Sequence, residues 1–323
     1  MEKKRRKLRK EFVMLMCTIV AAFVMIGMVT LYYQLFAAPL QEPRPTETHG
    51  TYDDEEDVKD PKEQENYEDS DGQEQAQTPG TNNNWSLVPM TVDDIIDTGY
   101  LQLVNRNHGA TELSHNLRTS AWPAVPVRVV DGMYLHGTAL AAVAEMFDYV
   151  RDTDVGPFFV TSGFRSIDDQ IDIYDNGANA DFALPPGYSE HHTGLAVDIL
   201  AVGVDMMALG NTTHGRWLAD NSYRFGLILR YPAGAEHITG IQHEPWHFRY
   251  IGRIHAYYMH RNNLVLEEYI DLLREKGEIT VEKDGVTYHI LHQVPENGII
   301  LVPDGLEFII SRDNLGGYIV KGW

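Results

Sequence analysis

The chain has 323 residues, enough for one sizeable domain with appended segments, and its hydrophobic content of 43% is ordinary for a protein with a buried core. It carries 47 Asp and Glu against 26 Lys and Arg, a formal net charge of -21. This balance argues against nucleic-acid binding, which requires a basic face. The single cysteine, Cys17, excludes an intramolecular disulfide and a cysteine-based metal site.

The N-terminal 40 residues combine a basic tail with a long uncharged stretch. Seven of residues 3–10 are basic, and residues 12–40 contain no charged side chain. A helix of about 20 residues crosses a bilayer, whereas a cleaved signal peptide has a shorter apolar stretch that ends in a small-x-small site. We therefore predict a cytoplasmic tail at 1–11 and an uncleaved transmembrane anchor at 12–40. The positive-inside rule then places the rest of the chain outside the cytoplasm.

Residues 41–84 are strongly acidic and poor in aliphatic side chains. Between Glu42 and Glu74 there are fourteen acidic residues against three basic ones. Such a segment cannot bury a core, and the repulsion between its charges extends it. We predict a disordered linker between the anchor and the folded region.

Residues 85–277 have the pattern of a folded domain that contains both helices and strands. We expect a capped short helix at 91–96 and a strand at 158–161 that leads into the polar segment SGFRS. Further strands are expected at 195–200, 227–231 and the end of 240–250, where His247 and Arg249 should face one side and Trp246, Phe248 and Tyr250 the other. The predicted helices are 138–149, 167–174, 215–225, 251–262 and 266–276, the last capped by Gly277.

Residues 278–323 differ in sequence pattern from the preceding domain. Short β-rich runs alternate with Asp-Gly, Asn-Gly and Gly-Gly turn signals. We predict a small accessory β module with strands at 279–282, 286–291, 298–302, 306–310 and 318–320.

Asp198 stands in the apolar run Leu195–Leu200, where a buried carboxylate costs several kcal/mol unless a partner compensates its desolvation. One compensating partner is a divalent metal shared with a nearby imidazole, such as that of His191. The other is an arginine or a set of backbone amides. The residues around Asp198 do not decide between these partners.

Two histidines and one carboxylate would form a catalytic type of zinc site. His191, Asp198 and His247 offer two nitrogens and one oxygen, which leaves a fourth position open. Glu244 lies three residues before His247, where it could serve as a general base. Arg165 could hold an oxyanion or a substrate carboxylate, but could equally be a structural ion-pair partner.

Three motifs resemble those of the VanY-like zinc D-alanyl-D-alanine carboxypeptidases. SEHHTGLAVD fits S-x-H-x-x-G-x-A-x-D, EPWH fits E-x-W-H, and SGFRS with the following Gln170 is similar to the family's upstream segment. The resemblance covers residues 91–274. It implies the α+β hedgehog/DD-peptidase fold, a small antiparallel sheet flanked by helices.

The resemblance also implies a role for each matched residue. It assigns Zn²⁺ to His191, Asp198 and His247, and the general base to Glu244. Arg165 would polarise the scissile carbonyl. Binding of the terminal D-alanine would fall to Ser189 and Gln170. His192, where we expect Gln more often in this family, could in principle reach the metal instead of His191. Adjacent side chains on an extended chain diverge, so we predict that His192 is a cleft-lining or surface histidine.

The combined prediction is a membrane-anchored zinc metallocarboxypeptidase on the outer face of a bacterial cell membrane. Its expected substrates are peptidoglycan stem peptides that end in D-Ala-D-Ala. The alternatives with the same metal centre are an L,D-carboxypeptidase, a D,D-dipeptidase and a peptidoglycan endopeptidase. A non-catalytic cell-wall-binding module is a further alternative, and the β-rich module could itself bind glycan or protein.

Overall fold

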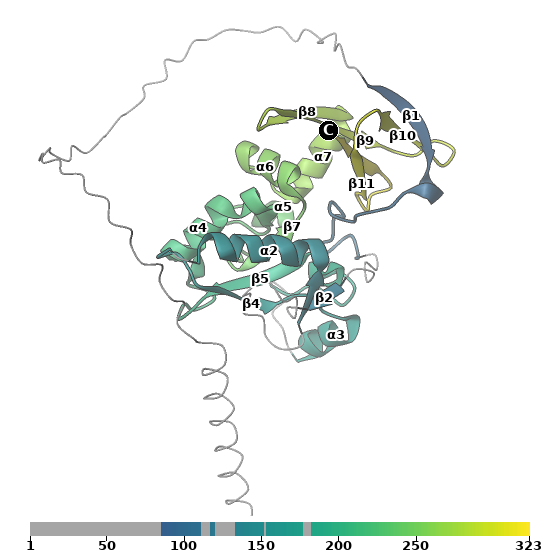
Figure 1. Ribbon diagram of the computed structural model, residues 1–323. Helices are drawn as coiled ribbons and strands as arrows, with labels where there is room; N and C mark the ends of the chain where they lie inside the picture. Colours follow the sequence, from purple (N-terminus) through teal and green to yellow (C-terminus); the bar gives the residue numbers. More distant parts are fainter. Residues whose placement is uncertain (1–84, 111–116, 120–132, 152, 177–181) are drawn as a thin grey trace, which may run out of the picture. The chain divides into compact units, whose positions relative to one another are not determined.

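The computed structural model describes residues 85–110, 117–119, 133–151, 153–176 and 182–323, which all belong to one compact unit covering Thr78–Trp323 (Figure 1). The predicted tail at 1–11, anchor at 12–40 and linker at 41–84 lie outside these residues. Among the helices that the structure describes, none combines the length and the hydropathy needed to span a bilayer.

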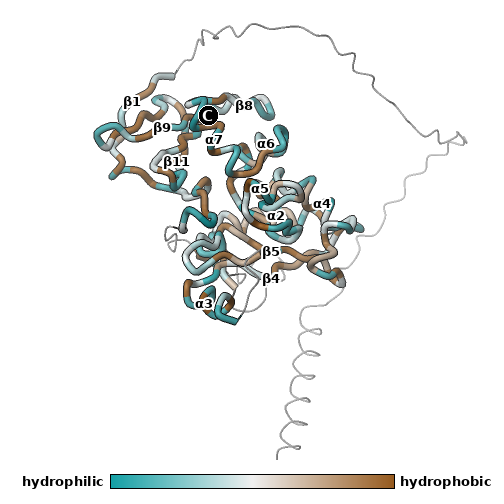
Figure 2. The backbone as a smooth tube through the Cα atoms, turned by 180° about the vertical axis from the view of Figure 1, so that it is seen from behind, coloured by the Kyte–Doolittle hydropathy of each residue, from teal (hydrophilic) through white to brown (hydrophobic). Residues whose placement is uncertain are grey.

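A four-stranded antiparallel sheet forms the centre of the first part of the unit. Its strand order is β4-β5-β7-β6, with β4 at Phe158–Ser162, β5 at Ala196–Ala201, β7 at His247–Tyr250 and β6 at Leu227–Leu229. Every residue of the two middle strands is buried, and the backbone tube along β4 and β5 is hydrophobic (Figure 2). The register sets Asp198 opposite His247, so residues far apart in sequence become cross-strand neighbours.

Helices cover this sheet and form the main core. Helix α2, Gly137–Tyr149, contributes Val143 and Met146 to a cluster that also contains Val197 and Phe248 of the sheet. Strand β7 alternates as predicted, because Phe248 and Tyr250 enter this core while His247 and Arg249 both contact Glu190 on the other side. The remaining elements of this part are β2 (Leu117–Thr119), β3 (Tyr134–His136), α3 (Ile167–Asp175), α4 (Thr213–Asn221) and α5 (Glu236–Thr239).

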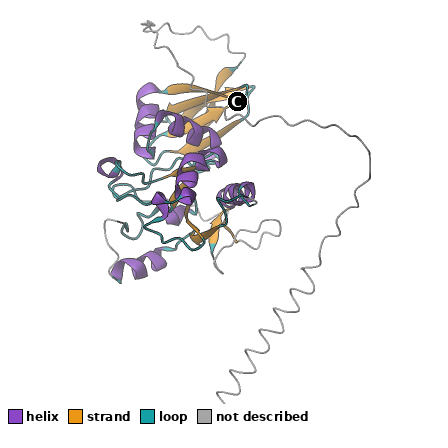
Figure 3. Ribbon diagram, turned by 90° about the vertical axis from the view of Figure 1, so that its left-hand side faces the viewer, coloured by secondary structure: helices purple, strands orange, loops and turns teal. Residues whose placement is uncertain are grey.

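The C-terminal module contains a second four-stranded antiparallel sheet, in the order β11-β12-β9-β8. One face, with Ile279 and Ile290, packs against helices α6 (Arg253–Asn262) and α7 (Leu266–Lys276); Figure 3 shows this pair of helices beside the strands. The other face, with Leu291 and Val320, packs against strand β10. The strands are β8 (Glu278–Lys283), β9 (Val286–Gln293), β10 (Ile299–Asp304), β11 (Phe308–Arg312) and β12 (Tyr318–Gly322).

The start of the described chain differs from the prediction of a capped helix at 91–96. Residues Ser86–Thr91 form strand β1, which pairs with β10 from Ser86↔Asp304 to Thr91↔Ile299, and only one 3₁₀ turn follows at Val92–Asp94. Val88 and Met90 pack on the core of the C-terminal module. Long-range strand pairing therefore overrides the local helix signal, and this N-terminal strand is part of the β-rich module.

Most other predicted elements are confirmed with shifted ends. The predicted helix at 215–225 is divided into α4 and the 3₁₀ segment Ser222–Phe225. The predicted helix at 251–262 begins only at Arg253, because Gly252 has a φ of 90° that the helix cannot contain. Gly277 ends α7 as predicted, and its N–H donates to the Leu273 carbonyl.

Gly194 gives a stability test of the turn that precedes β5. Its φ is 68°, and a Cβ added there would lie 2.7 Å from Leu117 Cδ2 and 3.1 Å from the His136 backbone nitrogen. Gly203 has a φ of 80° but nothing within 4 Å of an added Cβ. We expect Gly203→Ala to cost about 1–2 kcal/mol from backbone strain alone. Gly194→Ala should cost a further ~1–3 kcal/mol from the clash, measured by urea unfolding; equal losses would contradict this packing.

Candidate metal centre

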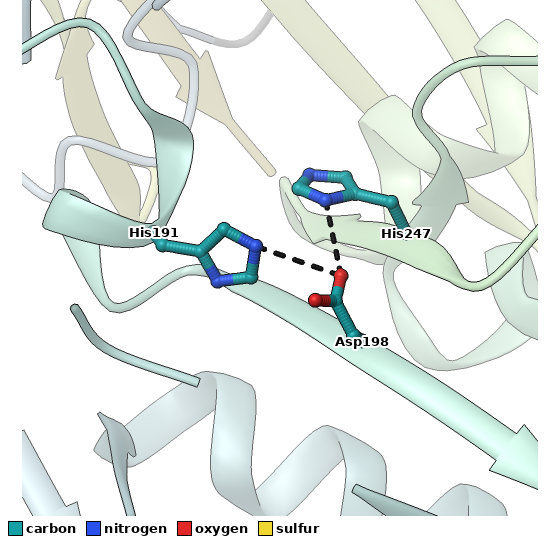
Figure 4. A group of neighbouring side chains, drawn as sticks. All are labelled: His191, Asp198 and His247. Atoms are coloured by element: carbon teal, nitrogen blue, oxygen red, sulfur yellow. Dashed lines mark ion pairs between the residues drawn. The ribbon is translucent and has the colours of Figure 1, made fainter. Parts of the chain in front are cut away.

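Three buried side chains from three elements meet above the middle of the sheet. His191 lies in the 3₁₀ turn Glu190–Thr193, Asp198 in β5 and His247 in β7, and one ligand atom of each lies within 4.8 Å of the others. Asp198 Oδ1 is 3.5 Å from His191 Nε2 and 3.2 Å from His247 Nδ1 (Figure 4). The register of β5 with β7 and the short turn before β5 produce this convergence.

The neighbours of the two imidazoles indicate where their protons lie. His191 Nδ1 is 2.7 Å from the Gly163 carbonyl oxygen, which can only accept, so Nδ1 donates there and Nε2 faces Asp198. His247 has a carboxylate oxygen beside each ring nitrogen, with Glu190 at 3.4 Å from Nε2 and Asp198 Oδ1 at 3.2 Å from Nδ1. Burial opposes protonation, but the two carboxylates raise the pKa of His247 to about 9, so a metal ion at Nδ1 would replace a proton.

This arrangement fits a divalent cation. Asp198 Oδ1 is buried and has no hydrogen-bond partner among the described residues. A buried carboxylate among two imidazoles needs a positive charge beside it, and a metal ion can supply that charge in place of the His247 proton. Two imidazole nitrogens and one carboxylate oxygen are the donor set of catalytic metal sites in which one position stays open.

Glu244 adds a second carboxylate beside the three donors. Its Oε2 is 3.6 Å from His247 Nδ1, and its side chain is buried. Burial raises the pKa of Glu244 to about 7, with His247 and Arg165 opposing the shift and Asp198 adding to it. A carboxyl group with a pKa near neutrality can both accept and return a proton.

A pocket of about 220 Å³ opens onto this centre. All seven site residues predicted from the sequence line it, namely Arg165, Gln170, Ser189, His191, Asp198, Glu244 and His247. Sequence reasoning did not identify the other wall residues that the fold adds, among them Phe182, Tyr231, Trp246 and Glu190. For Glu190 a signal existed, because it is an acidic residue next to a predicted ligand.

Arg165 is held in the pocket by two neutral side chains. Its Nη1 donates to Gln170 Oε1 at 2.7 Å and its Nη2 donates to Ser162 Oγ at 3.1 Å. Gln170 Nε2 in turn donates to the Leu184 carbonyl at 2.7 Å, and the Gln170 side chain is fully buried. Gln170 thus fixes Arg165 to the pocket wall, and its direct contact with a substrate stays a prediction.

Ser189 and His192 shape the turn on either side of His191. Ser189 Oγ accepts from the His191 backbone N–H at 3.3 Å. His192 is buried; its Nδ1 donates to the Arg165 carbonyl at 2.7 Å and its Nε2 accepts from the Gly187 N–H at 3.0 Å. Both ring nitrogens are engaged, so His192 is not the metal ligand. Its prediction as a cleft-lining or surface histidine was wrong: it ties Arg165 to the wall at Gly187.

Comparisons with known proteins find relatives among D-Ala-D-Ala peptidases. The VanY family, described as D-alanyl-D-alanine carboxypeptidase, matches residues 132–253. A D-alanyl-D-alanine carboxypeptidase of Enterococcus faecium is 39% identical over 58% of this chain and 61% of its own length. The bifunctional D-Ala-D-Ala dipeptidase and D-Ala-D-Ala carboxypeptidase VanXYC of Enterococcus gallinarum is 32% identical over 54% of this chain and 95% of its own.

A solved structure shares the fold. The vancomycin resistance D,D-dipeptidase VanXYg, crystallised with a D-Ala-D-Ala phosphinate analog, aligns with a TM-score of 0.62 at 24% identity over 74% of this chain and 99% of its own. The fold is therefore the mixed α and β fold of the D,D-peptidases. With the three motifs and the relatives above, the chain belongs to the VanY family, as the motifs predicted. It spans 61% of the length of the Enterococcus faecium relative.

Replacement of Asp198 by Asn tests whether this carboxylate is a metal ligand. In the presence of a chelator, Asp198→Asn should unfold at a lower temperature than wild type, because the Asp198 carboxylate pairs with the protonated His247 ring. Added divalent metal should widen the difference, because it stabilises the wild type by about 2.7 kcal/mol at a concentration of 100 Kd, whereas the variant has lost one donor. Thermal unfolding with and without metal measures both effects.

The exposed Asp220, changed to Asn, is the matched control and should leave the metal response intact. Equal stabilisation of Asp198→Asn and wild type by added metal would contradict the assignment of Asp198 as a ligand.

Proposed function

We propose that the chain is a zinc-dependent D-alanyl-D-alanine carboxypeptidase that removes the terminal D-alanine from peptidoglycan stem peptides. The observation that carries this proposal is the convergence of three metal-type donors beside Glu244 in a pocket. Zinc is the ion that best suits two imidazoles, one carboxylate and an open position. Membership of the VanY family supports D-Ala-D-Ala as the bond that is cleaved.

Each side chain around the centre has its own role in the proposed hydrolysis. A zinc ion held by His191, Asp198 and His247 would polarise the scissile carbonyl and lower the pKa of a water molecule. Glu244 accepts a proton as the water oxygen bonds to the carbonyl carbon, and delivers it to the leaving amine as the C–N bond breaks. Arg165, held by Gln170 and Ser162, faces the negative charge that develops on the carbonyl oxygen.

The size of the pocket favours a substrate that enters by its end. A volume of about 220 Å³ suits one or two small residues rather than the middle of a long peptide. Ser189 and Gln170, which line the pocket, are the groups we propose to bind the terminal D-alanine. No side chain in this scheme forms a covalent bond to the substrate, so chelators should inhibit the reaction and β-lactams should not.

The activity is tested with defined peptides. We expect metal-loaded protein to release D-alanine from a pentapeptide ending in D-Ala-D-Ala, with little release from the tetrapeptide ending in a single D-Ala. Mass spectrometry of the products separates this outcome from its rivals. Preferential cleavage of the tetrapeptide would identify an L,D-carboxypeptidase. Release of free D-Ala-D-Ala from the pentapeptide, or hydrolysis of the free dipeptide, would identify a D,D-dipeptidase. Cleavage of cross-linked muropeptides would identify an endopeptidase.

Glu244→Gln is the inactive control for this assay. We expect kcat to fall by ~10²–10⁴ because a general acid–base group is lost, while the zinc content stays at the wild-type level because Glu244 is not one of the three donors. Glu236→Gln, a carboxylate outside the pocket lining, should behave as wild type. An active Glu244→Gln would disprove the assigned mechanism, and an inactive wild type would favour a binding module.

We also propose that residues 12–40 anchor the protein in the bacterial cell membrane, with residues 1–11 in the cytoplasm and the peptidase outside. The support is the sequence, namely a basic cluster followed by an uncharged stretch of 29 residues and then the acidic segment 41–84. We expect the full chain to sediment with membranes and to be digested by protease added to intact protoplasts. Removal of residues 1–40 should give a soluble protein; a full chain found in the cytosolic fraction would contradict the proposal.

A further inference from the structure

Glu190 is a buried carboxylate in direct contact with His247, one of the three proposed metal ligands. It follows Ser189 in the turn that carries His191, and its side chain is completely buried. Its Oε2 lies 3.4 Å from His247 Nε2, the ring nitrogen that faces away from the metal centre. Its Oε1 accepts from Arg230 Nε at 2.9 Å and from Arg249 Nη1 at 3.0 Å.

The two arginines are themselves fixed by other partners. Arg230 donates from Nη1 and Nη2 to the two carboxylate oxygens of Glu267 in α7, at 2.9 and 2.7 Å. Arg249 Nη2 donates to the backbone carbonyls of Tyr100 at 3.3 Å and Gln102 at 3.1 Å. Both guanidinium groups are fully buried. The position of the Glu190 carboxylate is therefore set from two sides.

The contacts of Glu190 determine which nitrogen of His247 faces it. Its Oε1 is occupied by Arg230 and Arg249, and its Oε2 faces His247 Nε2. A carboxylate paired with two guanidinium groups accepts hydrogen bonds, so His247 Nε2 donates to it. The other nitrogen, Nδ1, is turned toward Asp198 and is the one that a metal ion can bind by displacing its proton.

We propose that Glu190 is the positioning residue of the metal centre: its carboxylate, clamped by Arg230 and Arg249, selects the tautomer and the ring orientation of His247 that leave Nδ1 free for the metal ion. The proposal rests on the proposed function only in that a metal binds there. Carboxylates that accept the second N–H of a ligating histidine orient its ring and raise its basicity as a ligand.

Glu190→Gln reverses this selection with almost no change of shape. The two arginine donors at Oε1 require an oxygen in that position, so the new amide NH₂ must take the place of Oε2. It then donates to His247 Nε2, which shifts the ring proton to Nδ1, where it opposes the metal. We expect the zinc affinity of Glu190→Gln to fall roughly 10- to 100-fold.

Glu267→Gln is the matched control. It also removes one carboxylate from Arg230, and so reports the effect of disturbing the buried ion pairs, but it does not contact His247. We expect it to lower the unfolding temperature in chelator while the zinc affinity stays at the wild-type value. Zinc affinity is measured on metal-free protein by competition with a chromophoric chelator, a readout that needs no enzymatic activity.

The outcomes separate this inference from the proposed function. Equal zinc affinity of Glu190→Gln and wild type, or equal weakening by Glu190→Gln and Glu267→Gln, would overturn the positioning role. A wild type that binds no zinc would instead overturn the metal site itself. If Glu190→Gln does not fold, the comparison is made between Arg249→Met and the double variant Arg249→Met/Glu190→Gln, in which the loss of the arginine offsets the lost negative charge. The double variant must bind zinc more weakly than Arg249→Met. Equal zinc affinity of the two would refute the proposal.

Discussion

The register between β5 and β7 is the constraint on which the metal centre depends. Side chains alternate across a strand, so a slip of one residue would move an entire set of side chains to the opposite face. In the observed register Asp198 stands opposite His247, while Val197 and Phe248 enter the core on the other face. The same apolar side chains that stabilise the sheet therefore fix the distance between two of the three donors. The third donor, His191, depends on the turn directly before β5.

The face of this sheet that carries the three donors also holds buried charged side chains. Arg230, Arg249, Glu190 and Asp198 are all at most 8% exposed. Each would cost several kcal/mol if left alone, and breaking one buried pair costs about 3–5 kcal/mol because it leaves an uncompensated charge. The arginines and Glu190 compensate one another through direct hydrogen bonds. Asp198 Oδ1 has two imidazoles beside it and no arginine, and this difference distinguishes the proposed metal ligand from Glu190.

The parts of the structure that could be predicted from the sequence carry strong local signals. The helix at 138–149, the strand at 158–161 and the cap at Gly277 are confirmed, because apolar periodicity and a glycine with positive φ determine each of them locally. The motifs identified the family and named the residues that the structure brings into one pocket. Their catalytic roles stay predictions.

The parts that could not be predicted depend on contacts between distant residues. The strand at Ser86–Thr91 needs β10, more than 200 residues later, and no local pattern indicates that pairing. The role of His192 depends on Arg165 and Gly187, which approach it only in the fold. For Glu190, the sequence shows an acidic residue beside a ligand, but only the folded chain brings Arg230 and Arg249 to it.

The pairing of β1 with β10 also determines how the unit bears mechanical load. A force applied to the chain before residue 85 enters at β1 and passes along six consecutive residue pairs into β10 of the C-terminal module. The sheet β4-β5-β7-β6, which carries two of the three donors, lies further along the chain, beyond this ladder. Tension on the N-terminus would therefore be resisted first by the β-rich module, and the spacing of the three donors would be insulated from it.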